Sequence, residues 1–199
     1  MPDSVDKSDP DSQGRLVDAD AFWTFSLAIY GKPEVADLCL ALQDMSGTNV
    51  NLVLFCCWIA EAFEARINHA GADRLIGEIQ PWEDDVVQPL RRIRRTMKGR
   101  LARMPSEHRA QLSHLREAIK RTELDAEHIE QRLLALAWPE RLAPATRTSP
   151  EPAAAIARAN IGDYMAAAGL ALPADRPELV GELVGAVFAP PATPIASKG

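Results

Sequence analysis

A chain of 199 residues, of which 47% are hydrophobic, is long enough to fold as one domain around its own core. Its formal net charge of −6 argues against a general nucleic-acid-binding protein, although it allows a local basic patch. The three cysteines are an odd number, and Cys56 and Cys57 are neighbours in an apolar run, so they predict buried thiols in a reducing compartment rather than a disulfide framework.

The N-terminal segment predicts neither export nor membrane insertion. Residues 1–17 are rich in Asp, Ser and Pro, contain no apolar signal-peptide region and predict a disordered tail. The most apolar run, residues 52–60, is far shorter than the roughly 20 residues that a membrane helix needs. We therefore expect a cytoplasmic protein that is not inserted in a membrane.

Three helices are expected next, and they should form the core over residues 18–71. The first ends at Tyr30, and the second opens with a proline, covers 33–44 and stops before Gly47. The third, 49–69, begins with an asparagine suited to capping. Because its first two turns are apolar on all sides, we expect it at the centre of the fold, with Phe55 and Trp58 buried.

Residues 72–138 predict a long antiparallel helical hairpin. After a short helix around residues 73–79, Pro81 should open a longer helix, and the next helix should begin at Ser106. Its heptad stripe is Leu112, Leu115, Ile119, Thr122, Ala126, Ile129, Leu133 and Leu136. The facing positions are Val86, Leu90, Ile93, Met97 and Leu101. The two stripes predict a hairpin of roughly 35 Å.

The rest of the chain predicts a linker and two further helices. Residues 139–152 contain four prolines, 153–189 should hold the C-terminal helices, and 190–199 should be a disordered tail. The predicted fold is therefore all-α: a single domain over 18–189, with an orthogonal helical core and a long antiparallel helical hairpin.

Three segments resemble a known family. FWTFSLAIYGKPEVADLCLALQDMSGTNVNLVLFCCWIAEAF is similar to the N-terminal signature of a family of small helical bacterial proteins that is described only as a domain of unknown function. PWEDDVVQPLRRIRRTMK and ANIGDYMAAAGL are also similar to its pattern, so the resemblance covers about residues 20–189. It implies a bacterial, cytoplasmic, helical protein, and it implies no activity, ligand or catalytic residue.

A polar cluster flanks the turn between the second and third helices: Gln43, Asp44, Asn49 and Asn51. An amide just inside a very apolar helix needs a hydrogen-bond partner, and a carboxylate in the last turn of a helix is opposed by the helix dipole. These residues could form a ligand pocket with Asp44 as an acid, a base or an anchor. They could equally be caps that tie the turn together.

A basic run follows on the hairpin, with eight basic residues and one acid, Glu107, between Arg91 and Arg109. In one interpretation, the residues near the tip bind an anionic partner: Arg95, Lys98, Arg100 and Arg103. In the other, the run is a solvated face whose arginines pair with acids of the partner helix. Antiparallel pairing would place those acids opposite Arg91 and leave the tip unpaired.

Motifs for catalysis or for a metal are not recognisable. The four histidines have no HExxH spacing, no CxxC occurs, and neither GxSxG, GxGxxG nor a Walker loop is present. We therefore predict no cofactor and a non-enzymatic interaction or adaptor module that binds another protein through the hairpin, with RNA or a phosphate-bearing ligand as further candidates at its tip. The alternative is a small-ligand-binding protein or enzyme that uses the pocket near Asp44. The oligomeric state stays open.

Overall fold

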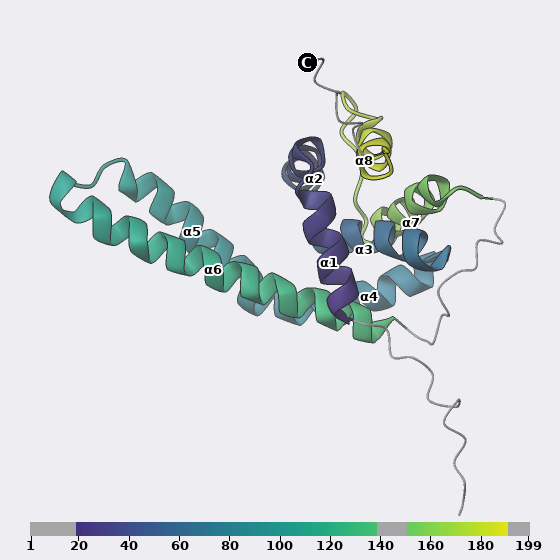
Figure 1. Ribbon diagram of the computed structural model, residues 1–199, viewed down its shortest axis with the longest axis horizontal. Helices are drawn as coiled ribbons and strands as arrows, with labels where there is room; N and C mark the ends of the chain where they lie inside the picture. Colours follow the sequence, from purple (N-terminus) through teal and green to yellow (C-terminus); the bar gives the residue numbers. More distant parts are fainter. Residues whose placement is uncertain (1–18, 139–150, 191–199) are drawn as a thin grey trace, which may run out of the picture.

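The computed structural model describes residues 19–138 and 151–190, and within these ranges the regular structure is helical (Figure 1). The all-α class predicted from the sequence is confirmed. The predicted N-terminal tail (1–17), all but the end of the predicted linker (139–152) and all but the first residue of the predicted C-terminal tail (190–199) lie outside the described residues.

The core is built around one apolar helix. The helices concerned are α1 (Ala19–Tyr30), α2 (Pro33–Ser46), α3 (Val50–Phe63), α7 (Ala153–Ala167) and α8 (Leu179–Val187). From Val50 to Ala60 every residue of α3 is buried, as its apolar sequence predicts. Phe55 and Trp58 pack with Phe22 of α1, with ring centroids 5.1 and 5.2 Å from that of Phe22. Helix α3 therefore lies at the centre of the core, where α1 and α7 pack against it.

Local capping defines where α2 ends and α3 begins. Gly47 follows α2 with φ 72°, a left-handed conformation that favours glycine. The side chain of Asn49 then accepts a hydrogen bond from the amide of Leu52 at 3.1 Å and caps α3. Both features are those expected from the sequence.

The C-terminal end of α3 differs from the expectation. The helix was expected to continue to His69, but it ends at Phe63, and Glu64 adopts a left-handed φ of 49°. Asn160 of α7 explains the break. Its side chain is fully buried, accepts from the amide of Ile67 at 2.8 Å and donates to the carbonyl of Ala65 at 3.1 Å. It thus supplies hydrogen-bond partners to backbone groups that have none within a helix after α3 ends.

The first arm of the hairpin is one continuous helix with a widened turn in it. It comprises α4 (His69–Trp82), the π-helical turn η2 (Glu83–Val87) and α5 (Gln88–Leu101). The expectation that Pro81 opens a helix is wrong, because α4 runs through it. Pro89 has no N–H, and its ring crowds the carbonyl four residues earlier, in η2. A π turn relieves this crowding by opening the backbone there.

The second arm, α6 (Ser106–Ala137), runs antiparallel to the first (Figure 1). Its 32 residues correspond to about 48 Å at the helical rise, so the arm is longer than the 35 Å expected. Near the core, the indole N–H of Trp82 donates to the carbonyl of Ala126 at 2.9 Å. The other end projects from the body of the molecule, on the left of Figure 1.

The face that α6 turns inward matches the predicted stripe only in part, since Ala126 is buried and Leu133 is partly buried against the core. Leu115, Ile129 and Leu136 are exposed, as is Ile93 on α5. The buried residues of α6 are Glu123, Ala126, Glu130, Gln131, Leu134 and Ala135. The heptad prediction is therefore wrong for Leu115, Ile129 and Leu136. Polar partners on α3 and α5 instead hold Glu123, Glu130 and Gln131 inside.

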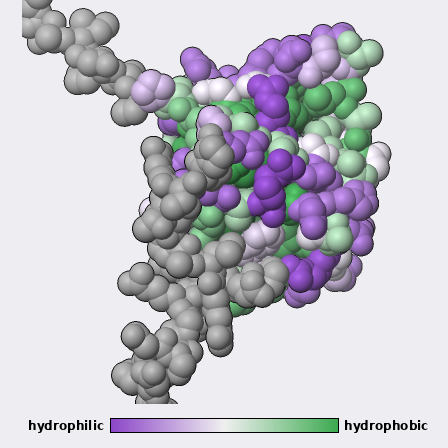
Figure 2. All heavy atoms as spheres, turned by 90° about the vertical axis from the view of Figure 1, so that its right-hand side faces the viewer, coloured by the Kyte–Doolittle hydropathy of each residue, from purple (hydrophilic) through white to green (hydrophobic). Residues whose placement is uncertain are grey.

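The remaining surface is mixed in character. Figure 2 looks at the side of the core that lies on the right in Figure 1, and hydrophilic and hydrophobic residues are interspersed across the part of it that is described. Among the described helices, none combines the length and the apolar character needed to cross a membrane. Cys39, Cys56 and Cys57 are buried free thiols, and burial raises the pKa of Cys39 to about 12.

Candidate functional site: a buried polar network between two clefts

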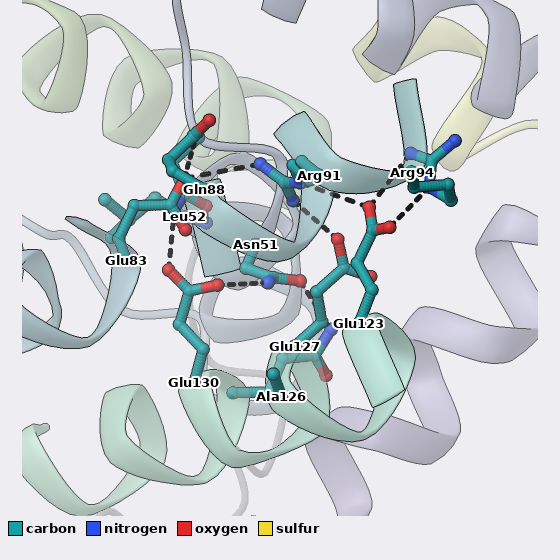
Figure 3. A network of polar contacts seen from close by, with 12 residues as sticks. Asn51, Leu52, Glu83, Gln88, Arg91, Arg94, Glu123, Ala126, Glu127 and Glu130 are labelled. Atoms are coloured by element: carbon teal, nitrogen blue, oxygen red, sulfur yellow. Dashed lines mark hydrogen bonds and ion pairs between the residues drawn. The ribbon is translucent and has the colours of Figure 1, made fainter. Parts of the chain in front are cut away.

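Arg91 of α5 lies at the centre of a buried polar network (Figure 3). It is 5% exposed, and its guanidinium contacts Glu83 at 3.3 Å, Glu123 at 3.6 Å and Glu127 at 2.5 Å. Arg94, one turn further along, forms two hydrogen bonds with the carboxylate of Glu123. Burial lowers the pKa of Arg91, but the hydrogen bond and charge of Glu127 and the charge of Glu83 outweigh this, so the guanidinium stays charged.

Glu130 of α6 is the second centre of the network. It is fully buried, and its two oxygens accept from Asn49 Nδ2 at 2.7 Å and Asn51 Nδ2 at 2.6 Å. Gln131 donates to Asn51 Oδ1 at 2.8 Å. Burial, with a further contribution from Glu83, raises the pKa of Glu130 to about 8 even though both amides favour the charged form. This carboxyl group therefore changes protonation near neutral pH.

The π turn brings Glu83 into the network. Gln88 donates to Glu83 Oε1 at 2.6 Å, and Arg91 contacts the same oxygen. Glu83 Oε2 is buried and has no hydrogen-bond partner among the described residues. The network thus holds four carboxyl groups against two guanidiniums: Glu83, Glu123, Glu127 and Glu130 against Arg91 and Arg94. The raised pKa of Glu130 keeps one of the four mainly protonated at neutral pH. Within the described ranges, no group of three or more His, Cys, Asp and Glu side chains could hold a metal ion.

One cleft, the α1 cleft, lies between the first helices and the hairpin and has a volume of about 530 Å³. Its apolar lining is Trp23, Leu27, Tyr30, Leu40, Val50, Leu54 and Leu124. Arg95, Lys120 and Arg121 also line it, and they take part in no ion pair within the described chain. Ser26 Oγ and Gln131 Oε1 belong to lining residues and are buried without a hydrogen-bond partner among the described residues. This cleft therefore combines apolar walls with cationic side chains that have no ion-pair partner among the described residues.

The other cleft, the α4 cleft, lies between the α2–α3 turn, α4 and α7 and has a volume of about 600 Å³. Its charged lining is Asp44, Glu83, Asp84 and Arg95, so acids outnumber bases. Thr48 lines it as well, and its buried hydroxyl has no partner in the described part of the protein. Glu83 and Gln88 line this cleft, whereas Arg91, which contacts Glu83, lines the α1 cleft. The polar network therefore separates the two clefts.

The predicted polar cluster is divided between these features. Asn49 and Asn51 meet at Glu130, so their amides have the partners that their position in an apolar helix requires. Asp44 is exposed and lines the α4 cleft, whereas Asn51 lines the α1 cleft, so the two do not share a pocket. Gln43 lines both clefts.

The predicted basic residues are likewise divided. Arg91 and Arg94 pair with acids of α6, as expected for antiparallel arms. Arg95, Lys98, Arg100 and Arg103 are exposed and form no ion pair with any described residue. Arg95 lines both clefts, while Arg100 and Arg103 line a separate open hollow at the hairpin tip.

Glu123 and Glu130 were among the acids expected to pair with the arginines across the hairpin, but their burial and the part played by Glu83 were not predicted, because acids on long helices usually face water. In the sequence, Glu83 follows Pro81 and so falls in a predicted first helical turn, where the helix dipole favours an acid. That position accounts for an acid at residue 83 without any buried partner. A signal did exist on α6, because Glu123 and Glu130 are seven residues apart and flank the small Ala126. Such spacing places both acids on one face of a helix.

The comparisons with known proteins give one match. Residues 21–134 match the family model described as "Protein of unknown function (DUF2390)". The matched segment extends from α1 to near the end of α6 and contains every residue of the polar network. No curated protein and no solved structure matches the chain.

Proposed function

The chain belongs to this family of proteins of unknown function, and we propose from its geometry that it is a non-catalytic interaction module that binds an acidic, amphipathic segment of a partner protein in the α1 cleft. One observation carries the proposal: exposed apolar side chains from three helices surround the cleft, beside cations that have no acidic partner in the described chain.

The apolar component of the α1 cleft comes from three helices and remains partly in water. Leu27 of α1, Leu40 of α2 and Leu124 of α6 are 52%, 46% and 47% exposed and line the same cleft. Tyr30 stands beside them and is also exposed. Contiguous apolar side chains that remain in water mark interaction surfaces, and a helix with an apolar face is a usual occupant of such a groove.

The charged component determines the sign of the partner. Arg95, Lys120 and Arg121 line the cleft without an ion pair in the described chain. Glu117, which also lines it, is paired with Arg116 at 3.0 Å. In a chain of net charge −6, this local excess of positive charge favours acidic residues on the partner.

The network behind the cleft supplies rigidity. Arg91 and Arg94 tie α5 to α6, and Asn51 ties α3 to α6 through Glu130 and Gln131. A groove whose walls are fixed in advance loses less conformational entropy when a partner binds. We further propose that the protein is cytoplasmic, which the three buried free thiols support.

A second candidate function is anion binding at the hairpin tip, by RNA or a phosphate-bearing ligand. Arg100 and Arg103 support it, because they are exposed at the hairpin tip and have no ion-pair partner in the described chain. Such binding should weaken steeply as salt rises. The charge-reversal variant Arg100→Glu/Arg103→Glu should abolish it.

The test uses labelled peptides and fluorescence polarisation. A set of amphipathic helical peptides with acidic polar faces is titrated against the wild-type protein, alongside scrambled peptides of the same composition. For the peptides that bind, Leu124→Asp should weaken affinity at least tenfold, since it places a charge inside the groove. Leu136→Asp is the matched control, because Leu136 is 68% exposed on the same helix and does not line the cleft.

The outcomes separate the candidates. Tighter binding of the amphipathic peptides than of the scrambled ones, lost in Leu124→Asp and kept in Leu136→Asp, supports the groove. Equal affinities for the two variants would remove the α1 cleft from consideration. RNA binding that Arg100→Glu/Arg103→Glu abolishes and Leu124→Asp leaves intact would instead favour the tip.

A further inference from the structure

We propose that the α4 cleft is a binding site for a small organic cation, a primary amine with a short apolar body, held by Glu83 and Thr48. The site lies on the other side of the polar network from the α1 cleft and has the opposite charge. It does not depend on the function proposed above.

Glu83 offers a carboxylate oxygen to which no described residue donates a hydrogen bond. Its Oε1 accepts from Gln88 at 2.6 Å and contacts Arg91 at 3.3 Å. Its Oε2 is buried, belongs to a residue that lines the cleft, and has no hydrogen-bond partner among the described residues. Buried carboxylate oxygens are usually satisfied by donors, and an ammonium group brings three of them.

Thr48 lines the same cleft and supplies a second buried oxygen without a hydrogen-bond partner among the described residues. Its side chain is 2% exposed, and its hydroxyl has no partner within the described ranges although the residue lines the cleft. A hydroxyl oxygen can accept a second hydrogen bond from an ammonium group that binds Glu83. Leu52, Ile79 and Tyr164 line the cleft beside them and would contact a short alkyl chain.

The charges around the cleft favour a cation. Asp44, Glu83 and Asp84 line it against the single guanidinium of Arg95. Behind it, Glu83, Glu123 and Glu127 share the two guanidiniums of Arg91 and Arg94, so the network carries more negative than positive charge even with Glu130 protonated. A cation at Glu83 would offset this excess. The N–H groups of an ammonium ion can donate to Glu83 Oε2 and to the Thr48 hydroxyl oxygen. The described residues offer no group of three or more ligands for a metal ion.

The experiment is isothermal titration calorimetry of the full-length protein with butylammonium chloride. Butyrate has a similar body with the opposite charge, and tetramethylammonium has the same charge without N–H donors. Butylammonium should bind at one site, and the other two should bind much more weakly. Glu83→Gln should weaken binding by roughly 30-fold, as expected when one partner of a buried charge pair is lost. Thr48→Val should weaken it about fivefold, the value of a single hydrogen bond.

The control variant is Glu78→Gln, which removes an exposed acid of α4 that does not line the cleft. It should bind butylammonium like the wild type. Thermal unfolding of each variant shows whether it is folded, and if Glu83→Gln is not, Thr48→Val decides alone. The proposal is overturned if Thr48→Val binds as well as Glu78→Gln, if butyrate or tetramethylammonium binds as well as butylammonium, or if butylammonium shows no saturable binding. Peptide binding in the α1 cleft is a separate readout, so either proposal can fail without the other.

Discussion

Replacing Arg91 by methionine should destabilise the protein more than any other single change on the hairpin. Methionine has a similar length and removes only the guanidinium. In the wild type, that group contacts the carboxylates of Glu83, Glu123 and Glu127 at 2.5 to 3.6 Å and offsets part of their charge. The variant would leave these carboxylates together around an apolar side chain.

The magnitude follows from burial. Removing one partner of a buried ion pair costs about 3–5 kcal/mol, because the remaining charge stays desolvated. The lower end applies here, since Glu123 keeps Arg94 and the side chain of Glu127 is 24% exposed to water. We therefore expect a loss of about 3 kcal/mol, a large part of the 5–15 kcal/mol that is typical of a domain.

Urea denaturation followed by circular dichroism measures this loss. Arg92→Met is the matched control, because Arg92 is the next residue of α5 and is exposed, so the change should be within about 0.5 kcal/mol of the wild type. Arg91→Lys should fall between the two, since one ammonium keeps the charge but cannot reach three carboxylates. A loss below about 1 kcal/mol for Arg91→Met, or one equal to that of Arg92→Met, would refute the idea that this guanidinium holds the network together.

Three further predictions concern stability, and each is measured by urea denaturation. Trp58→Ala should cost about 3–5 kcal/mol through lost burial and a cavity, and a loss below about 1 kcal/mol would count against α3 as the central helix. Because the pKa of Glu130 is raised from 4.5 to about 8, the folded protein binds a proton that the unfolded chain releases, so the free energy of unfolding should fall between these pH values and level off above them. Glu130→Leu should lose that slope, and an unchanged slope in the variant would show that another group is responsible. Gly47→Ala should cost about 1 kcal/mol because φ is 72°, whereas Gly77→Ala, in an open helical position, should stabilise by up to about 1 kcal/mol, and equal effects would contradict this explanation.

Features that depend on neighbouring residues were predictable from the sequence. Gly47 and Asn49 mark the turn between α2 and α3, because a left-handed glycine and an asparagine cap act within a few residues. The burial of α3 followed from its uniformly apolar sequence. The early end of α3 was not predictable. Asn160, which forms hydrogen bonds with the backbone of Ala65 and Ile67 just after the helix, lies almost a hundred residues further along the chain.

The candidate site was predictable only where it depends on local sequence, and its long-range partners were not. Asn51 drew attention because an amide in an apolar helix needs a partner, but its partner Glu130 comes from a distant helix. The leucine stripe of α6 suggested the wrong inner face, because the hydrophobic pattern does not register how strongly Arg91 and Arg94 attract buried acids. The inner face of α6 therefore includes acids paired with α5, which a hydrophobic pattern alone does not identify.

The π turn makes one position of the hairpin tolerant of a change in chain length. Between Glu83 and Val87 the helix accommodates one residue more than an α-helical turn would hold. Because the wider turn already absorbs the extra residue, deleting a single residue there would restore α-helical geometry and leave the helix after it close to its present rotation relative to α4. Deleting one residue between Gln88 and Arg91, where the helix is already α-helical, would instead rotate Arg91 and Arg94 by about 100° and turn them away from the acids of α6. The same loss of one residue is therefore absorbed in one turn of this arm and disruptive in the next.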